Sequence, residues 1–539
     1  MATERIDPQK ALSCLGTLKS ARSGFEGLWE EIRKVTYPTA SEFTSRVIRG
    51  AKLHKDIFDG SGEMASEMLA SALFGMATNP ATKWLGVVPQ NRDLLDDEDT
   101  ALWYEDATNR MLAMFNNPIT NFSTQQFLKL QNFVAFGTGP QFIAEMPGGI
   151  PLFQTAALAQ CFIGESDAGR VDTVYRLYSR TARQLAAKFK TGLPVKVLEK
   201  SINPKRMDED VEILHVIEPR LEREAGRIDG LNKPFREAYI VVADKHLIAE
   251  SGYDEKPWVA PRMNPRPGEV YGRGRGMTAH ADTKMLQRSM KSTIRAAEKR
   301  TDPPVQVPDD GVMSPLRMTP AAVNVIRADL MQFAGGGIRA IDTGADPIIG
   351  EEFNGSIRLR IDRAYWLPIL QAFTDPKMTA TQVLKLDEQT LRFIGPILGR
   401  MQSEDLGPMA ARVFPIMLRG GQFLPIPPAM EGTQWEVEYV SPIAKAQRLE
   451  EARGIAETME LLAPVISAKP HVLDNLDEDA AFRATAELRS VPKNMLRSRD
   501  TVKKIRDKRA EAAAAAEQSK ALIDGAPPAA KMITALSQA

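Results

Sequence analysis

Five basic residues in one segment are spaced so that their side chains could bind a polyanion. They follow one another at intervals of four, three, four and four residues: Lys284, Arg288, Lys291, Arg295 and Lys299. In a helix this spacing places all five along one face, and the apolar or small residues between Leu286 and Ala297 fall roughly opposite. The pattern therefore predicts a helix with one packing face and one face for water or phosphate.

The basic charge is concentrated in this segment. The chain of 539 residues has 69 Lys and Arg against 69 Asp and Glu, whereas residues 271–300 have eight basic residues against Asp282 and Glu298, a net charge of +6. One interpretation is an ordinary solvated helix face. The other is a helix that runs beside a polyanion such as nucleic acid. The neutral total charge disfavours a free-standing DNA-binding protein.

The basic segment has defined ends. Gly272, Gly274 and Gly276 precede it, and Pro303 and Pro304 follow it. These residues predict a helix over 276–300 that starts at a flexible glycine hinge and stops at the prolines. The letters GRGRG superficially resemble a phosphate-binding loop. They lack the GxGxxG spacing and follow no βαβ pattern, so the hinge is favoured.

The sequence contains no recognisable catalytic motif. It lacks the Walker GxxxxGK[ST], GxSxG, HExxH and CxxC patterns. Two cysteines, Cys14 and Cys161, and five scattered histidines predict a reducing compartment, no structural zinc and no cofactor. The acid pairs 309–310 and 351–352 could bind Mg²⁺ in a nuclease, although adjacent acids on loops are usually solvated. A non-enzymatic role is expected, with a metal-dependent nuclease as the alternative.

Neither a secretory signal nor a membrane span is expected. The first ten residues contain acids and no apolar core, and the longest apolar runs are too short or are interrupted by Gly and Pro.

Hydrophobic spacing before the basic segment predicts a mixed α+β body. Helices are expected over 8–36, 59–76 and 182–190, and another around Trp103 after an acidic stretch that would cap it. A β-hairpin is expected over 142–154, and strands are expected over 171–180, 211–219 and 238–248. A chain of this length should divide into several cores.

After the basic segment the pattern becomes less regular. Residues 303–354 are rich in Pro and Gly, too irregular for a core of their own. A helix over 356–373 with a kink at Pro368 should follow, then a helix from Thr379 bent by several prolines, and a strand at 435–440. Beyond Arg497 the sequence is basic and then rich in alanine, which predicts partial disorder.

Several motifs together resemble one protein family, although none is specific alone. The basic segment supplies YGRGRG (271–276) and DPP (302–304). The others, in order, are Trp29, DGSGEMASEMLASALFGMATNPATKW (59–84), NF (121–122), FGTG (136–139), DTVYRLYSRTARQ (172–184), MTATQV (378–383) and SPIAKAQ (441–447). Their order and spacing resemble the portal proteins, or head-to-tail connectors, of short-tailed, T7-like bacteriophages. The chain departs from that pattern at Gly60-Ser61 and at Leu85.

The resemblance implies an α+β portal fold that assembles as a ring. It implies a division of the chain into wing, stem, clip and crown. The segments are a wing (1–275 and 381–475), stem helices (276–300 and 356–373), a clip (301–355), a tunnel loop (374–380), and a crown with a low-complexity tail (476–539).

The resemblance also implies a structural role in a virion. A ring of about twelve subunits at one capsid vertex would let duplex DNA enter during packaging and leave during ejection. The implied partners are the major capsid and scaffolding proteins, the terminase large subunit and a tail adaptor, with assembly in the host cytoplasm and no membrane contact. An internal virion or ejection protein is a further alternative.

Geometry tests whether such a ring suits DNA. About twelve helices spaced by about 10 Å lie on a circle of about 38 Å diameter, which leaves a bore of about 28 Å. Duplex DNA of about 20 Å would pass with a layer of water to spare. If all five basic residues of every subunit contacted phosphate, DNA should be held too tightly to slide. Some of them are therefore expected to pair with acids of the next subunit.

The resemblance assigns roles to specific residues. The five basic residues become DNA-channel candidates, and Gly272, Gly274 and Gly276 form the hinge. Four residues are candidates for a loop that reaches toward DNA: Asp375, Pro376, Lys377 and Met378.

Overall fold

The computed structural model forms two compact units, Met1–Leu85 with Arg110–Phe423, and Gly86–Asn109 with Leu424–Ala539. We call them unit 1 and unit 2. The described residues are 5–44, 50, 52–309, 317–327, 338–371, 394–430, 434–439 and 499–524, without 225, 228, 343 and 345, together with a few isolated residues between 454 and 497. Within these ranges no helix has the length and apolar character needed to cross a bilayer.

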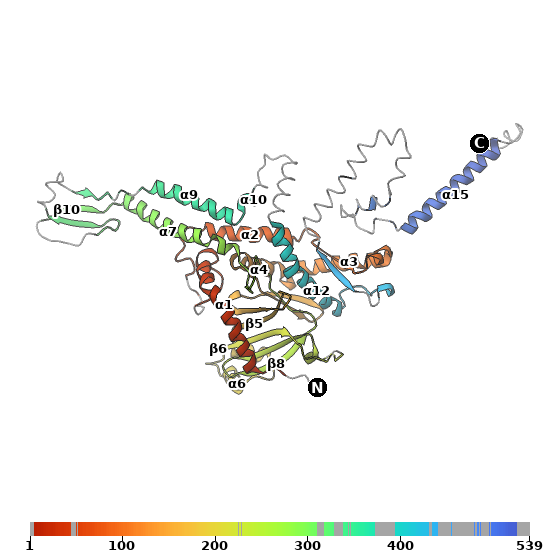
Figure 1. Cartoon of the computed structure of the whole chain (residues 1–539), viewed down its shortest axis with the longest axis horizontal. Coiled ribbons are helices and arrows are strands. Elements are labelled where there is room, and N and C mark those ends of the chain that lie inside the picture. Colours follow the sequence, from red (N-terminus) through yellow and green to blue (C-terminus); the bar gives the residue numbers. More distant parts are fainter. Residues whose placement is uncertain are drawn as a thin grey trace. The chain divides into compact units, whose positions relative to one another are not determined.

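The largest sheet of unit 1 is five-stranded and antiparallel, in the order β4-β5-β6-β7-β8. Its strands are β4 (Cys161–Glu165), β5 (Val171–Thr181), β6 (Asp210–Pro219), β7 (Phe235–Val241) and β8 (His246–Tyr253). The long helix α1 (Pro8–Thr36) covers one face, where Leu15 packs with Leu214 and Val216 (Figure 1). Because side chains alternate along a strand, Ile213, His215 and Ile217 point to the opposite face.

The predicted strands of this sheet are confirmed with one correction. The strand expected over 238–248 is two strands, β7 and β8, joined by a turn in which Lys245 has a φ of 47°. The apolar run over 238–243 continues up to the turn and so hides it. Sequence analysis did not anticipate β4. The short helix α5 (Ala182–Lys188) follows β5, as expected, with a capping box between Thr181 and Gln184.

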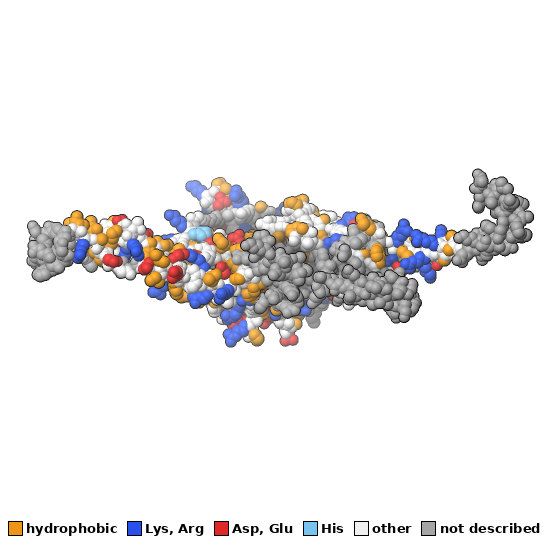
Figure 2. All heavy atoms as spheres, turned by 90° about the horizontal axis from the view of Figure 1, so that it is seen from above, with side chains coloured by type: hydrophobic (Ala, Val, Ile, Leu, Met, Phe, Trp, Pro, Cys, Tyr) orange, Lys and Arg blue, Asp and Glu red, His pale blue; other side chains and the backbone are white. Residues whose placement is uncertain are grey.

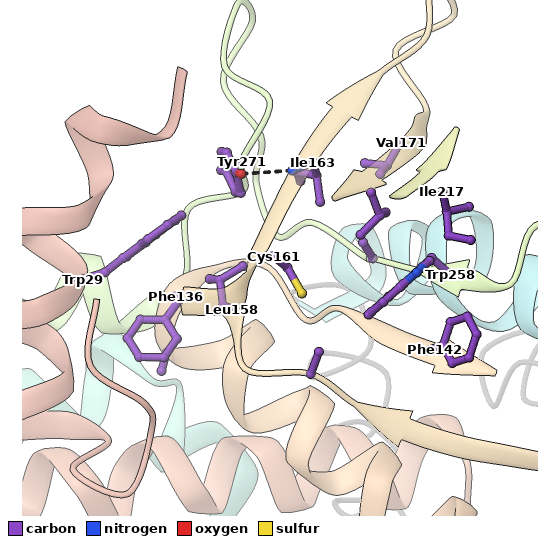
Figure 3. Packing of buried hydrophobic residues seen from close by; sticks show 14 of the residues in the cluster. Trp29, Phe136, Phe142, Leu158, Cys161, Ile163, Val171, Ile217, Trp258 and Tyr271 are labelled. Carbon is purple, nitrogen blue, oxygen red and sulfur yellow. Dashed lines mark hydrogen bonds between the residues drawn. The ribbon is translucent and has the colours of Figure 1, made fainter. Parts of the chain in front are cut away.

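A second sheet and the helices α2 (Ser61–Ala77) and α4 (Phe122–Phe136) complete the body of unit 1. The predicted hairpin is confirmed as β2 (Gln141–Met146) and β3 (Ile150–Thr155), and β9 (Trp258–Val259) pairs with β2. Aromatic side chains from distant segments fill the core between the sheets and α1. Figure 3 shows Trp29, Phe136, Phe142, Trp258 and Tyr271 in this cluster.

Two helices run side by side from this body: α7 (Arg275–Thr301) and α9 (Pro347–Ala364) (Figure 1). A three-stranded sheet follows α7. Its strand β10 (Val305–Asp309) pairs in parallel with β11 (Val323–Arg327) and antiparallel with β12 (Arg339–Ala340). The helix predicted over 276–300 is confirmed. The short extended pieces expected after it also form, and they pair with one another.

The helix predicted over 356–373 is wrong in both bounds. It begins at Pro347, because Asp346 caps it by accepting a hydrogen bond from the Ile348 amide at 2.9 Å. It ends at Ala364, and α10 (Leu367–Gln371) follows a break at which Trp366 has a φ of 59°. Pro368 therefore lies in the first turn of a new helix rather than at a kink, and the predicted clip over 301–355 includes the start of α9.

The helix expected from Thr379 is described from residue 394 onward. Residues 394–401 are α-helical, Gln402–Leu406 form a π-helical turn, and α12 (Gly407–Arg419) continues with Pro415 inside it. The residues expected to start this helix, Thr379 and Gln382, lie outside the described part of the chain.

Unit 2 contains a two-stranded sheet in which β1 (Leu85–Pro89) pairs with β13 (Trp435–Tyr439). The acidic stretch before α3 (Glu98–Asn116) caps it as predicted, because Asp97 accepts hydrogen bonds from the amide and hydroxyl of Thr100 at 3.0 and 2.6 Å. The partial disorder predicted beyond Arg497 is wrong for α15 (Arg499–Asp524), where Ala, Glu, Lys and Arg are all strong helix formers.

Candidate nucleic-acid interface

The start of α7 is fixed by close contacts between backbones. A Cβ placed on Gly274 would lie 2.5 Å from the Val134 carbonyl oxygen and 2.5 Å from the Gly137 nitrogen. A Cβ on Gly272 would lie 2.2 Å from the Gly137 oxygen, and one on Gly276 would lie 2.3 Å from the Ala135 oxygen. No other residue type fits at these distances. The glycines therefore have a packing role, and the hinge stays a prediction.

Replacing Gly274 by alanine should destabilise unit 1 by about 3 kcal/mol, because the added methyl group forces α7 away from the end of α4. Gly16 provides the matched control, since it lies inside α1 with no atom within 4 Å of a Cβ placed there. Gly16→Ala should be neutral or stabilising by up to about 1 kcal/mol. Urea unfolding monitored by tryptophan fluorescence measures both changes. Equal stability of the two variants would contradict the packing role.

Two aromatic side chains hold the same end of α7. The Tyr271 hydroxyl accepts a hydrogen bond from the Ile163 amide at 3.1 Å, and its ring packs edge-on against Trp29 (Figure 3). Burial raises the pKa of Tyr271, so the hydroxyl stays protonated. The Arg275 guanidinium lies 3.4 Å from the ring centroid of Trp366, at the break between α9 and α10. The start of α7 and the end of α9 are thus held together at the body.

One face of α7 packs along α9. Leu286 of α7 and Ile357 and Ile361 of α9 are buried. The Asn354 amide donates to the Thr293 hydroxyl at 3.2 Å, and Gly350 lets the two helices approach at that residue. Ion pairs flank the contact, between Arg360 and Asp282 at 3.2 Å and between Arg300 and Asp346 at 3.7 Å. The predicted packing face is confirmed at Leu286 and Thr293, while Ile294 is 37% exposed.

Gln287 joins the start of α2 to α7, a contact that sequence analysis missed. Its side-chain oxygen accepts from the amides of Phe58 and Asp59 at 2.7 and 3.0 Å, and its nitrogen donates to the Asp59 carbonyl at 2.6 Å. The Asp59 carboxylate pairs with Arg358 of α9 at 2.9 Å. Burial alone would raise the pKa of Asp59, but hydrogen bonds from Ser61 and Arg358 lower it. Three segments that are distant in sequence meet here, and no local sequence pattern predicts such a contact.

The five predicted basic residues lie on one face of α7, opposite the contact with α9. Lys284, Arg288, Lys291 and Arg295 are exposed and Lys299 is half-buried. Among the described residues no carboxylate lies within ion-pair distance of Arg288, Arg295 or Lys299. In the view of Figure 2, the end of the molecule that contains α7 and α9 presents hydrophobic side chains among charges of both signs. The structure thus confirms the spacing of the basic face, while its contact with DNA stays a prediction.

The other two basic residues have partners in their own chain. Lys284 pairs with Glu31 of α1 at 2.8 Å, and His280 contacts the same carboxylate at 2.9 Å. Hydrogen bonds from Lys284 and His280 lower the pKa of Glu31. The Lys291 ammonium lies 5.2 Å from the ring centroid of Phe58. The sequence analysis expected such cations to pair with acids of the next subunit, whereas the acid for Lys284 is intramolecular.

The remaining sequence candidates are placed only in part. Asp375, Pro376, Lys377 and Met378, the predicted tunnel loop, lie outside the described residues. Glu351 forms an ion pair with Arg358 at 2.5 Å on the surface of α9. Within the described part of the chain, no three His, Cys, Asp or Glu side chains gather as a metal site.

Solved structures give only a loose likeness. The chain aligns with one titled "Neck of empty GTA particle computed with C6 symmetry" at a TM-score of 0.35 and 10% identity, covering 79% of this chain and 97% of that one. It also aligns with "Virion of native gene transfer agent (GTA) particle" at a TM-score of 0.33 and 10% identity, covering 76% and 86%.

Sequence relatives cover nearly the whole chain. It is 29% identical over 525 residues to the portal protein of Salmonella phage epsilon15, covering 95% of this chain and 92% of that protein. It is 26% identical over 538 residues to the probable portal protein of Bordetella phage BPP-1, covering 98% and 96%. The family model described as bacteriophage head to tail connecting protein matches residues 8–496. The chain therefore belongs to the bacteriophage head-to-tail connecting protein family.

Proposed function

We propose that this head-to-tail connector forms a ring of about twelve subunits around duplex DNA at one capsid vertex. DNA would enter through the ring during packaging and leave through it during ejection. The family match over residues 8–496 supports the portal role. The observation that carries the DNA-channel proposal is the position of the basic face, opposite the face of α7 that packs on α9.

The charge available on that face suits a sliding contact. Arg288 and Arg295 are exposed, whereas Lys284 is paired with Glu31 and Lys291 lies over Phe58. Binding to phosphate becomes tighter and more salt-dependent with each cation that contacts it. Neutralisation of Lys284 within the subunit therefore allows attraction to DNA without a strong hold, and phosphate contacts impose no base sequence.

The other proposed roles follow the order of the elements. The sheet of β10, β11 and β12 after α7 would act as the clip that contacts the terminase large subunit and later a tail adaptor. Residues 374–380 would form the tunnel loop. The body of unit 1 would act as the wing, in contact with capsid and scaffolding proteins during assembly in the host cytoplasm. Energy for packaging would come from the motor, so this chain needs no cofactor and no catalytic site.

Electron microscopy of the purified full-length protein tests the assembly. We expect closed rings with a central hole, with about twelve-fold symmetry. A protein that stays monomeric at high concentration would contradict the ring. Mg²⁺-dependent DNA cleavage that is lost in the Glu351→Gln variant would instead support the nuclease alternative.

A further inference from the structure

Unit 1 contains a second cationic feature, on the face of the five-stranded sheet opposite α1. It is a pocket of about 370 Å³ between strands β5, β6 and β7, helix α5 and the β2–β3 hairpin. Buried side chains form its floor, among them Phe142, His215 and Tyr239. Three basic side chains, Arg176, Arg180 and Lys188, line it, and none of its lining residues is acidic.

The three cations are held on aromatic rings rather than by carboxylates. The guanidinium carbons of Arg176 and Arg180 lie 4.7 and 5.0 Å from the ring centroid of Tyr178, and the Lys188 ammonium lies 4.1 Å from that of Tyr239. Arg176 donates to the Gln160 side-chain oxygen at 3.3 Å. In the part of the chain that the structure describes, no carboxylate forms an ion pair with any of the three.

Glu237, an acid that contacts this floor, already accepts hydrogen bonds from other donors. One oxygen of Glu237 accepts from His215, Tyr239 and Tyr253 at 2.9, 2.9 and 2.8 Å. Burial lowers the pKa of Lys188; Glu237 opposes this shift, and the neighbouring arginines add to it. The basic side chains of the pocket therefore outnumber the acids available to pair with them, and the pocket keeps a net positive charge.

Other arginines buried in unit 1 each have a carboxylate partner. Arg22 pairs with Glu26 at 2.6 Å, Arg220 with Glu250 at 2.8 Å, and Arg412 with Glu255 at 2.5 Å. Guanidinium groups bind carboxylates through parallel hydrogen bonds that gain strength away from bulk water. Arg176 is half-buried and Arg180 is exposed, so neither belongs to this buried set, and both have donors for acids that unit 1 does not supply.

We propose that this pocket binds carboxylate side chains from an acidic peptide segment of a partner protein. Its volume is about ten times the share of one water molecule in the liquid, so it accommodates two or three side chains rather than a single small ion. The site is separate from the basic face of α7, and the proposal does not depend on the DNA-channel role.

Amine acetylation of the full-length protein, quantified residue by residue by mass spectrometry, tests the proposal directly. The probe is an octaglutamate peptide, with octaglutamine as the uncharged control. We expect octaglutamate to slow the acetylation of Lys188 at least about fivefold, and that of Lys190, which is exposed like Lys188 but lies outside the pocket, less than about twofold. Because acetylation is measured at each lysine separately, peptide binding in the pocket can be distinguished from binding to the basic face of α7, which also attracts anions.

Two matched variants test whether octaglutamate protects Lys188 by binding in the pocket. Arg180→Gln should raise the octaglutamate concentration for half-protection of Lys188 about tenfold, since it removes a cation of the pocket. Arg183→Gln removes an exposed cation from α5, the helix of Lys188, at a position outside the pocket where it pairs with Asp208 at 3.4 Å, and should leave that concentration within about twofold. The proposal is overturned if octaglutamate does not protect Lys188, if inorganic phosphate at equal ionic strength protects it as well, or if both variants weaken protection equally.

Discussion

Changing Arg288 and Arg295 together to glutamate should reduce the number of genome-filled particles at least about tenfold while rings still form. Both side chains are exposed, and neither has a carboxylate partner among the described residues. The new glutamates would face Lys284, Lys291 and Lys299 at helical spacings of three or four, so they can pair and the helix should stay stable. In each subunit of the proposed ring, the charge presented to phosphate would reverse at two positions.

The measurement is genome content per particle after infection with the variant phage, with ring assembly checked by electron microscopy. Arg288→Gln with Arg295→Gln should give an intermediate defect, because it removes charge without reversing it. Lys190→Glu with Lys205→Glu is the matched control, since it makes the same charge change at exposed positions of unit 1 outside α7. Normal genome content in the Arg288→Glu, Arg295→Glu variant would remove the basic face from the mechanism.

Replacing Asp405 by alanine should destabilise unit 1 by about 3–5 kcal/mol, the largest stability effect that we expect. Asp405 lies in the π-helical turn Gln402–Leu406 and pairs with Lys129 of α4, and both side chains are fully buried. Lys129 also donates to the Gln141 side chain at 2.9 Å. Without Asp405 the ammonium would be buried with no counter-charge. Urea unfolding monitored by tryptophan fluorescence provides the measurement.

The pH dependence of this variant has a definite sign. Burial lowers the pKa of Lys129 below its ordinary value of 10.5 even beside Asp405, and loss of Asp405 should lower it further. Between the lowered pKa and 10.5 the unfolded chain binds more protons than the folded one, so stability rises with pH. The deficit of Asp405→Ala should therefore shrink from pH 7 to pH 10. A deficit that grows over this range would disprove the buried ammonium.

A double variant distinguishes the effect of the unpaired charge from the effect of lost packing volume. Lys129→Met with Asp405→Leu replaces both charges by apolar groups of similar size and should recover most of the lost stability. If the double variant is as unstable as Asp405→Ala alone, the volume of the site, and not the unpaired charge, controls stability.

Some features could have been found in the sequence and others could not. Lys129 stands alone in the apolar stretch FLKLQNFVAF of residues 127–136, a signal for a buried and paired lysine. Its partner in a π-helical turn 276 residues away had no such signal. The start of α9 was missed because Gly350 and Gly355 resemble loop residues, whereas Gly350 is required where α9 meets Thr293.

The sequence by itself determined many of the helices and strands, and the basic face of α7, because these depend on periodicities of two and 3.6 residues that adjacent positions encode. Only the tertiary structure decided which cations remain unpaired. Glu31 reaches Lys284 and Phe58 reaches Lys291 from segments more than 200 residues earlier in the chain, and Arg176, Arg180 and Lys188 meet over one pocket without an acid. Whether a charge is neutralised depends on distances of a few ångströms between such segments, and local spacing does not encode those distances.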